Sequence, residues 1–148
     1  MRVYSKMCMA LLVALVGVGL MHGASLAAEE PIKAVTLDYV QAFYFHASYR
    51  CKKCTTLEQY SREAIETNFN NQLATGVLRF NEINFDKPEN RHYLQDYSLT
   101  YRALVLVRYK DGKQVAFKNL SKIWQLVGDK DAFLSYVKAE TEAYLKEL

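Results

Sequence analysis

Two cysteines that follow a short aromatic strand constrain this sequence more than any other feature. Residues 42–45 form an unbroken apolar run, which favours a strand covered on both faces. From Lys52 onward, apolar residues recur every three or four positions, which predicts a helix. Cys51 and Cys54 therefore lie one turn apart in the first turn of that helix. Because free N–H groups point outward there, the position favours the thiolate form of a cysteine.

The first 27 residues have the features of a secretory signal peptide. The segment begins with Arg2 and Lys6, continues with an apolar run over residues 7–21, and ends with small residues at 25–27. We therefore predict cleavage after residue 27, export to the periplasm or another extracytoplasmic space, and a single domain at residues 28–148. A membrane-spanning helix needs about 20 apolar residues and this run is shorter, so an uncleaved membrane anchor is the weaker interpretation. We expect no membrane attachment after cleavage.

Removing that signal leaves a chain with almost balanced charge. The sequence holds 19 Lys and Arg residues against 16 Asp and Glu residues, and of these only Arg2 and Lys6 lie in the signal, which leaves 17 against 16. This balance, without a basic stripe, argues against a nucleic-acid partner. Cys8 leaves with the signal, so Cys51 and Cys54 are the cysteines of the mature chain.

The remaining patterns predict the order β-α-β-α-β-β-α. Strands are expected at residues 39–45, 77–86, 104–107 and 114–118, and helices at 52 to about 73, 88–96 and from 130 onward, with a helical turn at 121–127. Residues 34–37 fit either an early strand or a helical turn. The apolar alternation of the second strand slips between Phe80 and Ile83, which predicts a bulge or a strand buried on both sides.

Turn and cap residues set the limits of these elements. Gly76 is expected to end the first helix, while Asp86 and Asp129 are expected to cap the next two. The Asp-Gly pair at 111–112 predicts a hairpin between the last two strands. A strand-helix-strand unit implies a parallel crossover, so the α/β fold has a mixed central sheet with helices on both faces.

This arrangement, with Cys-x-x-Cys at the start of a helix, resembles the thioredoxin fold over nearly the whole mature chain. A narrower resemblance is to small exported bacterial proteins catalogued as nitrophenyl-compound nitroreductase subunits. The motifs that carry it are Tyr44-Phe45-His46, Arg50-Cys51-x-x-Cys54, Asp111-Gly112-Lys113 and Leu126-Val127-Gly128-Asp129-Lys130.

The sequence departs from thioredoxins at two positions. Thioredoxins have a cis-proline before the third strand, where this chain has Tyr101-Arg102-Ala103. They also have a buried acid six residues before the first cysteine, where this chain has Phe45. Without a proline, we expect the Arg102 and Ala103 amides to face the Cys51 sulfur and the Arg102 side chain to add a positive charge. The competing interpretation is that Arg102 points to solvent and the loop only connects.

The resemblance implies that Cys51 is the attacking nucleophile and Cys54 the resolving thiol. The redox-active Cys51–Cys54 disulfide would then be the reactive group, with no separate cofactor. An unperturbed thiol of pKa ~8.5 is roughly 3% ionised at neutral pH. Nearby cationic groups raise that fraction, which makes the couple more oxidising than that of thioredoxin. The side chains expected to contribute are Arg50, Lys52, Lys53 and His46.

Other interpretations of the cysteine pair stay open. A structural disulfide is common in exported proteins, although closing so small a loop removes only about 2 kcal/mol of chain entropy. The two thiolates with His46 or His92 suit Cu(I). Thr55 follows Cys54, so the haem-attachment signal is absent. Lys52 and Lys53, between the cysteines, are equally consistent with solvent-exposed charges that have no effect on the thiols.

We therefore predict an exported thioredoxin-fold protein whose cysteine pair exchanges disulfides or electrons with the thiols of a protein partner. As an enzyme it would be a thiol-disulfide oxidoreductase. The alternatives are a copper-thiol carrier and a partner subunit with an inert disulfide.

Overall fold

The computed structural model describes residues 37–148, which lie within a compact unit that spans Ala34–Leu148. The predicted signal peptide and most of the element predicted at 34–37 lie outside the described residues. Of that element only Leu37 is described, and it precedes the first strand without regular structure. No helix within the described range combines the length and the apolar character that crossing a membrane requires.

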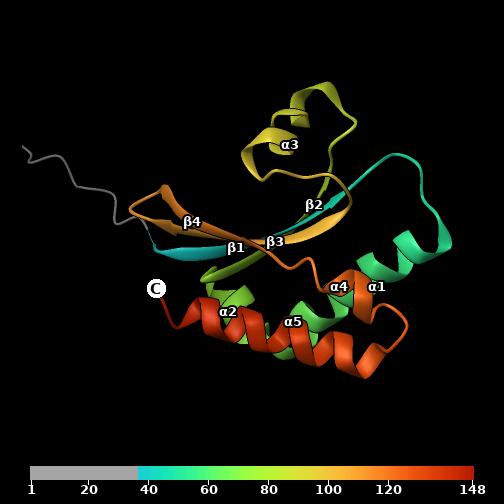
Figure 1. The fold of residues 1–148 in the computed structure, drawn as a ribbon. Coiled ribbons are helices and arrows are strands. Elements are labelled where there is room, and N and C mark those ends of the chain that lie inside the picture. Colours follow the sequence, from blue (N-terminus) through green and yellow to red (C-terminus); the bar gives the residue numbers. More distant parts are fainter. Residues whose placement is uncertain (1–36) are drawn as a thin grey trace, which may run out of the picture. The chain divides into compact units, whose positions relative to one another are not determined.

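A mixed sheet forms the centre of this unit (Figure 1). Its strands are β1 (Tyr39–His46), β2 (Leu78–Asn84), β3 (Ala103–Lys110) and β4 (Lys113–Asn119). They lie in the order β2-β1-β3-β4, with β1 parallel to β2, and with β3 antiparallel to both β1 and β4. The predicted parallel crossover and the predicted hairpin are therefore both confirmed.

Helices cover both faces of the sheet, as predicted (Figure 1). The elements are α1 (Lys52–Asn68), α2 (Asn70–Thr75), the 3-10 turn η1 (Pro88–Asn90), α3 (His92–Asp96), α4 (Ile123–Leu126) and α5 (Lys130–Leu145). The helices α1, α2, α4 and α5 lie on one face, and α3 lies on the other. This is the mixed α/β, thioredoxin-like fold that the sequence predicts.

Successive residues of the central strands enter different hydrophobic cores, because side chains alternate across a strand. The first core lies under α1 and α5 and includes Val40, Ala42, Tyr44, Leu104 and Leu106. The second core lies under α3 and includes Phe43, Phe45, Val105, Val107 and Tyr97. Both faces of β1 and β3 are therefore packed, which explains their nearly unbroken apolar sequences.

The predicted bulge in the second strand is absent from β2, whose register with β1 is continuous. Leu78 and Phe80 pack in the first core, whereas Ile83 packs in the second. The alternation slips in the sequence because apolar side chains of this strand point to both faces of the sheet. The irregular register lies instead between β3 and β4, at Arg108 and Tyr109.

The prediction of one long helix from residue 52 to about 73 is wrong. Two helices, α1 and α2, occupy that range and are separated at Phe69. The Phe69 backbone has φ −130° and ψ 32°, outside the helical region, while its ring is buried in the first core. Asn68 and Asn70 flank it, and asparagine side chains compete with the helix for backbone hydrogen bonds. Asn68 Nδ2 accordingly donates to the Ala64 carbonyl oxygen at 2.8 Å.

The prediction that Asp86 caps a helix over residues 88–96 is also wrong. That segment is divided into η1 and α3, and Lys87, which precedes a proline, is extended with φ −67° and ψ 135°. Asp86 Oδ2 instead accepts a hydrogen bond from the Ser48 amide at 2.7 Å. The aspartate therefore holds the loop that leads to the cysteine pair.

The other predicted caps and turns are confirmed. Asp129 Oδ1 accepts from the Ala132 amide at 3.1 Å and caps α5. Asp111 and Gly112 join β3 to β4 with φ values of 50° and 73°. Gly76 follows α2 with φ 75°, the left-handed conformation in which glycine has no steric penalty.

We expect Gly76→Ala to destabilise the protein by about 1 kcal/mol, because the left-handed backbone conformation at this position is unfavourable for alanine. No atom lies within 4 Å of the added Cβ, so the effect isolates the backbone. Urea unfolding is the measurement. Gly128→Ala is the matched control, since its Cβ also meets no atom within 4 Å and its φ is not in the left-handed range. Equal stability of the two variants would contradict the prediction.

Candidate functional site

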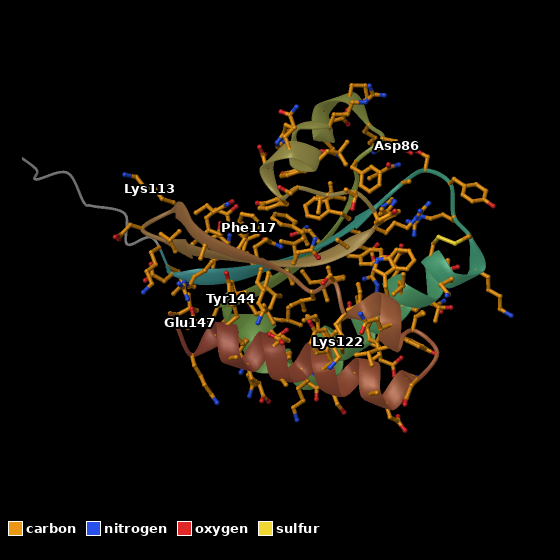
Figure 2. The ribbon with its side chains drawn as sticks, in the orientation of Figure 1. Asp86, Lys113, Phe117, Lys122, Tyr144 and Glu147 are labelled. Atoms are coloured by element: carbon orange, nitrogen blue, oxygen red, sulfur yellow. A yellow bond between two sulfur atoms is a disulfide. The ribbon has the colours of Figure 1, made fainter. Side chains whose placement is uncertain are left out.

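Cys51 and Cys54 form a disulfide at the start of α1 (Figure 2). Cys51 is the N-cap residue, with an extended backbone, and its Sγ accepts a hydrogen bond from the Cys54 amide at 3.1 Å. Cys51 is partly exposed, whereas Cys54 is only 2% exposed. The predicted placement at a helix N-terminus is therefore present, and Cys51 is the more exposed of the two cysteines.

The loop between β1 and Cys51 is tied to the end of β2. The Phe85 amide donates to the His46 carbonyl oxygen at 2.9 Å, which extends the parallel pairing of the two strands. Asn84 Nδ2 donates to Ser48 Oγ at 3.0 Å, and the Ser48 amide donates to Asp86. These contacts fix the path by which the chain leaves β1 and reaches the first cysteine.

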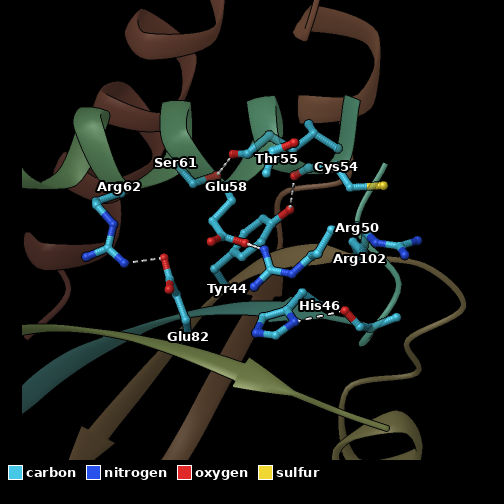
Figure 3. Close-up of polar contacts among 12 residues, drawn as sticks. Tyr44, His46, Arg50, Cys54, Thr55, Glu58, Ser61, Arg62, Glu82 and Arg102 are labelled. Carbon is cyan, nitrogen blue, oxygen red and sulfur yellow. Dashed lines mark hydrogen bonds and ion pairs between the residues drawn. The ribbon is translucent and has the colours of Figure 1, made fainter. Parts of the chain in front are cut away.

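Tyr44 lies directly beneath the cysteine helix (Figure 3). Its hydroxyl donates to the Cys54 carbonyl oxygen at 3.1 Å, and its side chain is fully buried. Burial raises the pKa of Tyr44 well above its usual value, although the charges of Arg50 and Arg102 oppose the shift. The phenol therefore keeps its proton and remains a hydrogen-bond donor over the physiological pH range.

Tyr44 was not among the predicted site residues, because the position six residues before Cys51 is Phe45. Phe45 belongs to the second core and faces away from α1. Tyr44 faces α1 because it alternates with Ala42 in the first core. The alternation of β1 was the signal that could have found it.

Arg50 forms an ion pair with Glu58 on α1 (Figure 3). The two side chains are 33% and 17% exposed, so the pair is partly screened from water. Glu58 lies one turn after Cys54, a spacing that places the two side chains near each other on a helix. The positive charge predicted to favour a Cys51 thiolate is therefore balanced by a nearby carboxylate that sequence reasoning missed.

Arg102 lies against the loop that precedes the cysteines. Its guanidinium donates to the Tyr49 carbonyl oxygen, and its own carbonyl oxygen accepts from Trp124 Nε1 at 2.8 Å. The Arg102 side chain is partly exposed and contacts the loop that leads to Cys51. In this disulfide form, the amide that donates to Cys51 Sγ is that of Cys54, whereas Ala103 begins β3 opposite Phe45. Donation from the Arg102 and Ala103 amides stays a prediction for the reduced form.

The remaining predicted residues occupy different surroundings. Lys52 and Lys53 are exposed. His46 Nδ1 lies 3.0 Å from the Ala47 carbonyl oxygen, a contact that requires a proton on that nitrogen. His92 is on α3, where it contacts Asp96 at 2.7 Å, and it is therefore on the opposite face of the sheet from α1. Across residues 37–148, no three His, Cys, Asp or Glu side chains gather as a metal site.

Solved structures that match this chain do so at low sequence identity and low TM-score. No model of a protein family matches the sequence, and no curated protein matches it. Thioredoxin of Fasciola hepatica is 22% identical over 61% of this chain and 79% of its own, with a TM-score of 0.36. Oxidised mitochondrial thioredoxin 3 of Saccharomyces cerevisiae is 19% identical over 62% and 77%, with a TM-score of 0.36. A thioredoxin of Thermus thermophilus is 14% identical over 61% and 72%, with a TM-score of 0.37. The fold assignment rests on the sheet order and helix placement described above.

We expect Glu58→Gln to lower the pKa of Cys51 in the reduced protein by about half a unit to one unit. Removing the carboxylate leaves Arg50 uncompensated near the forming thiolate, which the positive charge stabilises. Thiolate absorbance followed against pH is the measurement. Glu63→Gln removes another α1 carboxylate, which pairs with Lys130, and should leave the titration unchanged. Identical shifts in both variants would show that Glu58 has no particular influence on the pair.

Proposed function

We propose that this protein exchanges disulfides with the thiols of a protein partner through Cys51 and Cys54, acting as a thiol-disulfide oxidoreductase outside the cytoplasm. The observation that carries the proposal is the disulfide at the N-terminus of α1, with one sulfur accessible and the other buried. That arrangement gives the two sulfurs different tasks, because only Cys51 can meet a partner in solution. A structural disulfide has no need of such a difference.

In the reduced protein, the Cys51 thiolate attacks one sulfur of a partner disulfide. A new Cys51-to-partner disulfide forms as the partner's own S–S bond breaks, and the partner releases one thiolate. Cys54 then loses its proton and attacks Cys51 Sγ, which releases the second partner thiolate and closes the Cys51–Cys54 disulfide. Two electrons pass to the partner, whose two thiolates take up two protons. The same steps in reverse oxidise a partner dithiol.

The surroundings of the pair support these assignments. The Cys54 amide already points at Cys51 Sγ, so a negative charge on that sulfur has a donor in place. Lys52 and Lys53 add exposed positive charge beside it. The Tyr44 hydroxyl binds the Cys54 carbonyl oxygen and so holds the first turn of α1 in position while the sulfurs exchange.

The proposed location follows from the predicted signal peptide. Disulfides form and persist in oxidising compartments outside the cytoplasm. An exported protein with one accessible pair suits exchange with other exported proteins. The narrower resemblance to nitroreductase subunits stays a prediction and adds no chemistry to this proposal.

The two alternatives have less support from the site. A copper-thiol carrier with a histidine ligand would use His46 or His92, but His92 lies on the other face of the sheet and His46 Nδ1 contacts the Ala47 carbonyl oxygen. An inert disulfide in a partner subunit agrees with the same bond geometry. Its reduction potential would lie below about −300 mV, as is typical of structural disulfides.

We expect iodoacetamide to alkylate Cys51 of the reduced protein below neutral pH and much faster than Cys54. Cys51 is partly exposed at a helix N-terminus, whereas Cys54 is buried. Mass spectrometry of peptides from timed reactions measures both rates against pH. Equal rates for the two cysteines, or alkylation of Cys51 with the pH dependence of a free thiol, would contradict the nucleophile assignment.

We expect Cys54→Ser to accumulate a mixed disulfide between Cys51 and its partner, because no resolving thiol remains to release it. The variant is expressed in full in a bacterial host and trapped complexes are isolated from the periplasmic extract. Cys51→Ser is the matched control and should trap nothing. If the extract yields no complex, and the wild-type pair has a potential below about −300 mV, the disulfide is structural.

A further inference from the structure

A groove beside the disulfide carries positive charge that the proposed exchange does not by itself require. It is an open depression of about 540 Å³ between the start of α1 and the end of α4. Its lining residues are Lys52, Lys53, Thr56, Trp124, Gln125, Val127 and Gly128. Lys52 and Lys53 lie between the two cysteines in sequence, so the groove begins beside the disulfide.

Trp124 lines the groove, and two contacts hold its side chain in place. Its Nε1 donates to the Arg102 carbonyl oxygen at 2.8 Å, and its ring meets that of Tyr101 edge to face, with centroids 6.2 Å apart. Tyr101 and Tyr49 are 69% and 75% exposed. A fixed indole in the groove with exposed aromatic rings nearby offers apolar contacts to the side chains of a peptide segment.

The two lysines occupy positions where a helix disfavours positive charge. Lys52 and Lys53 are the first residues of α1, and the first turn contains no acidic residue. A helix N-terminus carries a partial positive charge, so lysines there cost stability and carboxylates add to it. The sequence therefore places two cations against the helix dipole at the edge of the groove.

Nearby acidic side chains do not neutralise these lysines. Within residues 37–148, neither lysine forms an ion pair. Glu58 pairs with Arg50, and Asp129 accepts the amide hydrogen bond that caps α5. None of the residues that line the groove is acidic. The positive charge at its rim is therefore available to a partner.

We infer that the partner's reacting cysteine lies in an acidic segment, whose carboxylates bind at Lys52 and Lys53 while its chain lies over Trp124. This inference rests on the proposed function and names the chemistry of the protein that it exchanges with. Charge complementarity of this kind speeds association and selects among partners more than it adds to final affinity. The same lysines could instead act only on the Cys51 thiolate, and the test below separates these two roles.

The test uses the reduced wild-type protein and three peptides that differ only in the residues beside one cysteine. That cysteine is joined by a disulfide to a small neutral thiol, and its flanking residues are glutamates, glutamines or lysines. The second-order rate constant is measured from the loss of protein thiols at low salt. We expect the glutamate peptide to react about tenfold faster than the glutamine peptide and the lysine peptide to react more slowly than both, with the differences shrinking as salt is added.

The double variant Lys52→Gln/Lys53→Gln should lose this order of rates. We expect it to fold, because removing cations from the start of α1 relieves their repulsion with the helix dipole. The matched control is Lys110→Gln/Lys113→Gln, which removes the same charge from the hairpin; Figure 2 shows Lys113 at the opposite end of the sheet from the disulfide. That control should keep the order of rates.

Each result decides a separate point. If Lys52→Gln/Lys53→Gln slows all three peptides by the same factor and keeps their order, the lysines act only on the thiolate and the inference is wrong. If the wild-type protein reacts equally with all three peptides, the acidic partner is wrong while thiol exchange stands. If it reacts with none of them, nor with the small disulfide itself, the proposed function fails and this inference fails with it.

Discussion

The pairing of β1 with both β2 and β3 is the interaction on which the rest of this structure depends. β1 is the strand that contacts both hydrophobic cores and also leads into the cysteine pair. Its parallel pairing extends to Phe85, whose amide binds the His46 carbonyl oxygen. Asn84 and Asp86 then bind the next turn of chain at Ser48. The position of the disulfide is thus set by the register of two strands, and not by the loop alone.

The chemistry of the pair reflects two opposing sets of charges. The helix N-terminus, the Cys54 amide and the exposed Lys52 and Lys53 favour a negative Cys51 sulfur. The Glu58 carboxylate on the same helix pairs with Arg50, which reduces the stabilisation that the Arg50 charge gives to a Cys51 thiolate. Counting the basic residues near the cysteines in the sequence therefore overestimates the positive electrostatic potential at Cys51. In the proposed exchange, the balance between these groups, and not any one of them, would set the reactivity of Cys51.

Sequence patterns predicted those parts of the fold that depend on neighbouring residues in the chain. The start of α1, the apolar spacing of α5, the Asp111-Gly112 turn and the Asp129 cap were all predicted and are confirmed. The break at Phe69 was missed because the spacing of apolar residues continues through it. Asp86 was misassigned because its carboxylate can accept a hydrogen bond either from a helix N-terminus or from a distant loop. Only the fold decides which of these donors lies within reach, and here it is the Ser48 amide.

The sequence by itself determined that two cysteines stand at the start of a helix after a buried strand, because periodicity and helix-start signals act within a few residues. Only the tertiary structure decided which side chains surround them. Tyr44, Glu58 and Arg102 come from β1, α1 and the approach to β3, and strand pairing and helix packing bring them together. Which face of a strand or helix meets another is decided by the packing of the whole sheet, so no local pattern specifies these contacts.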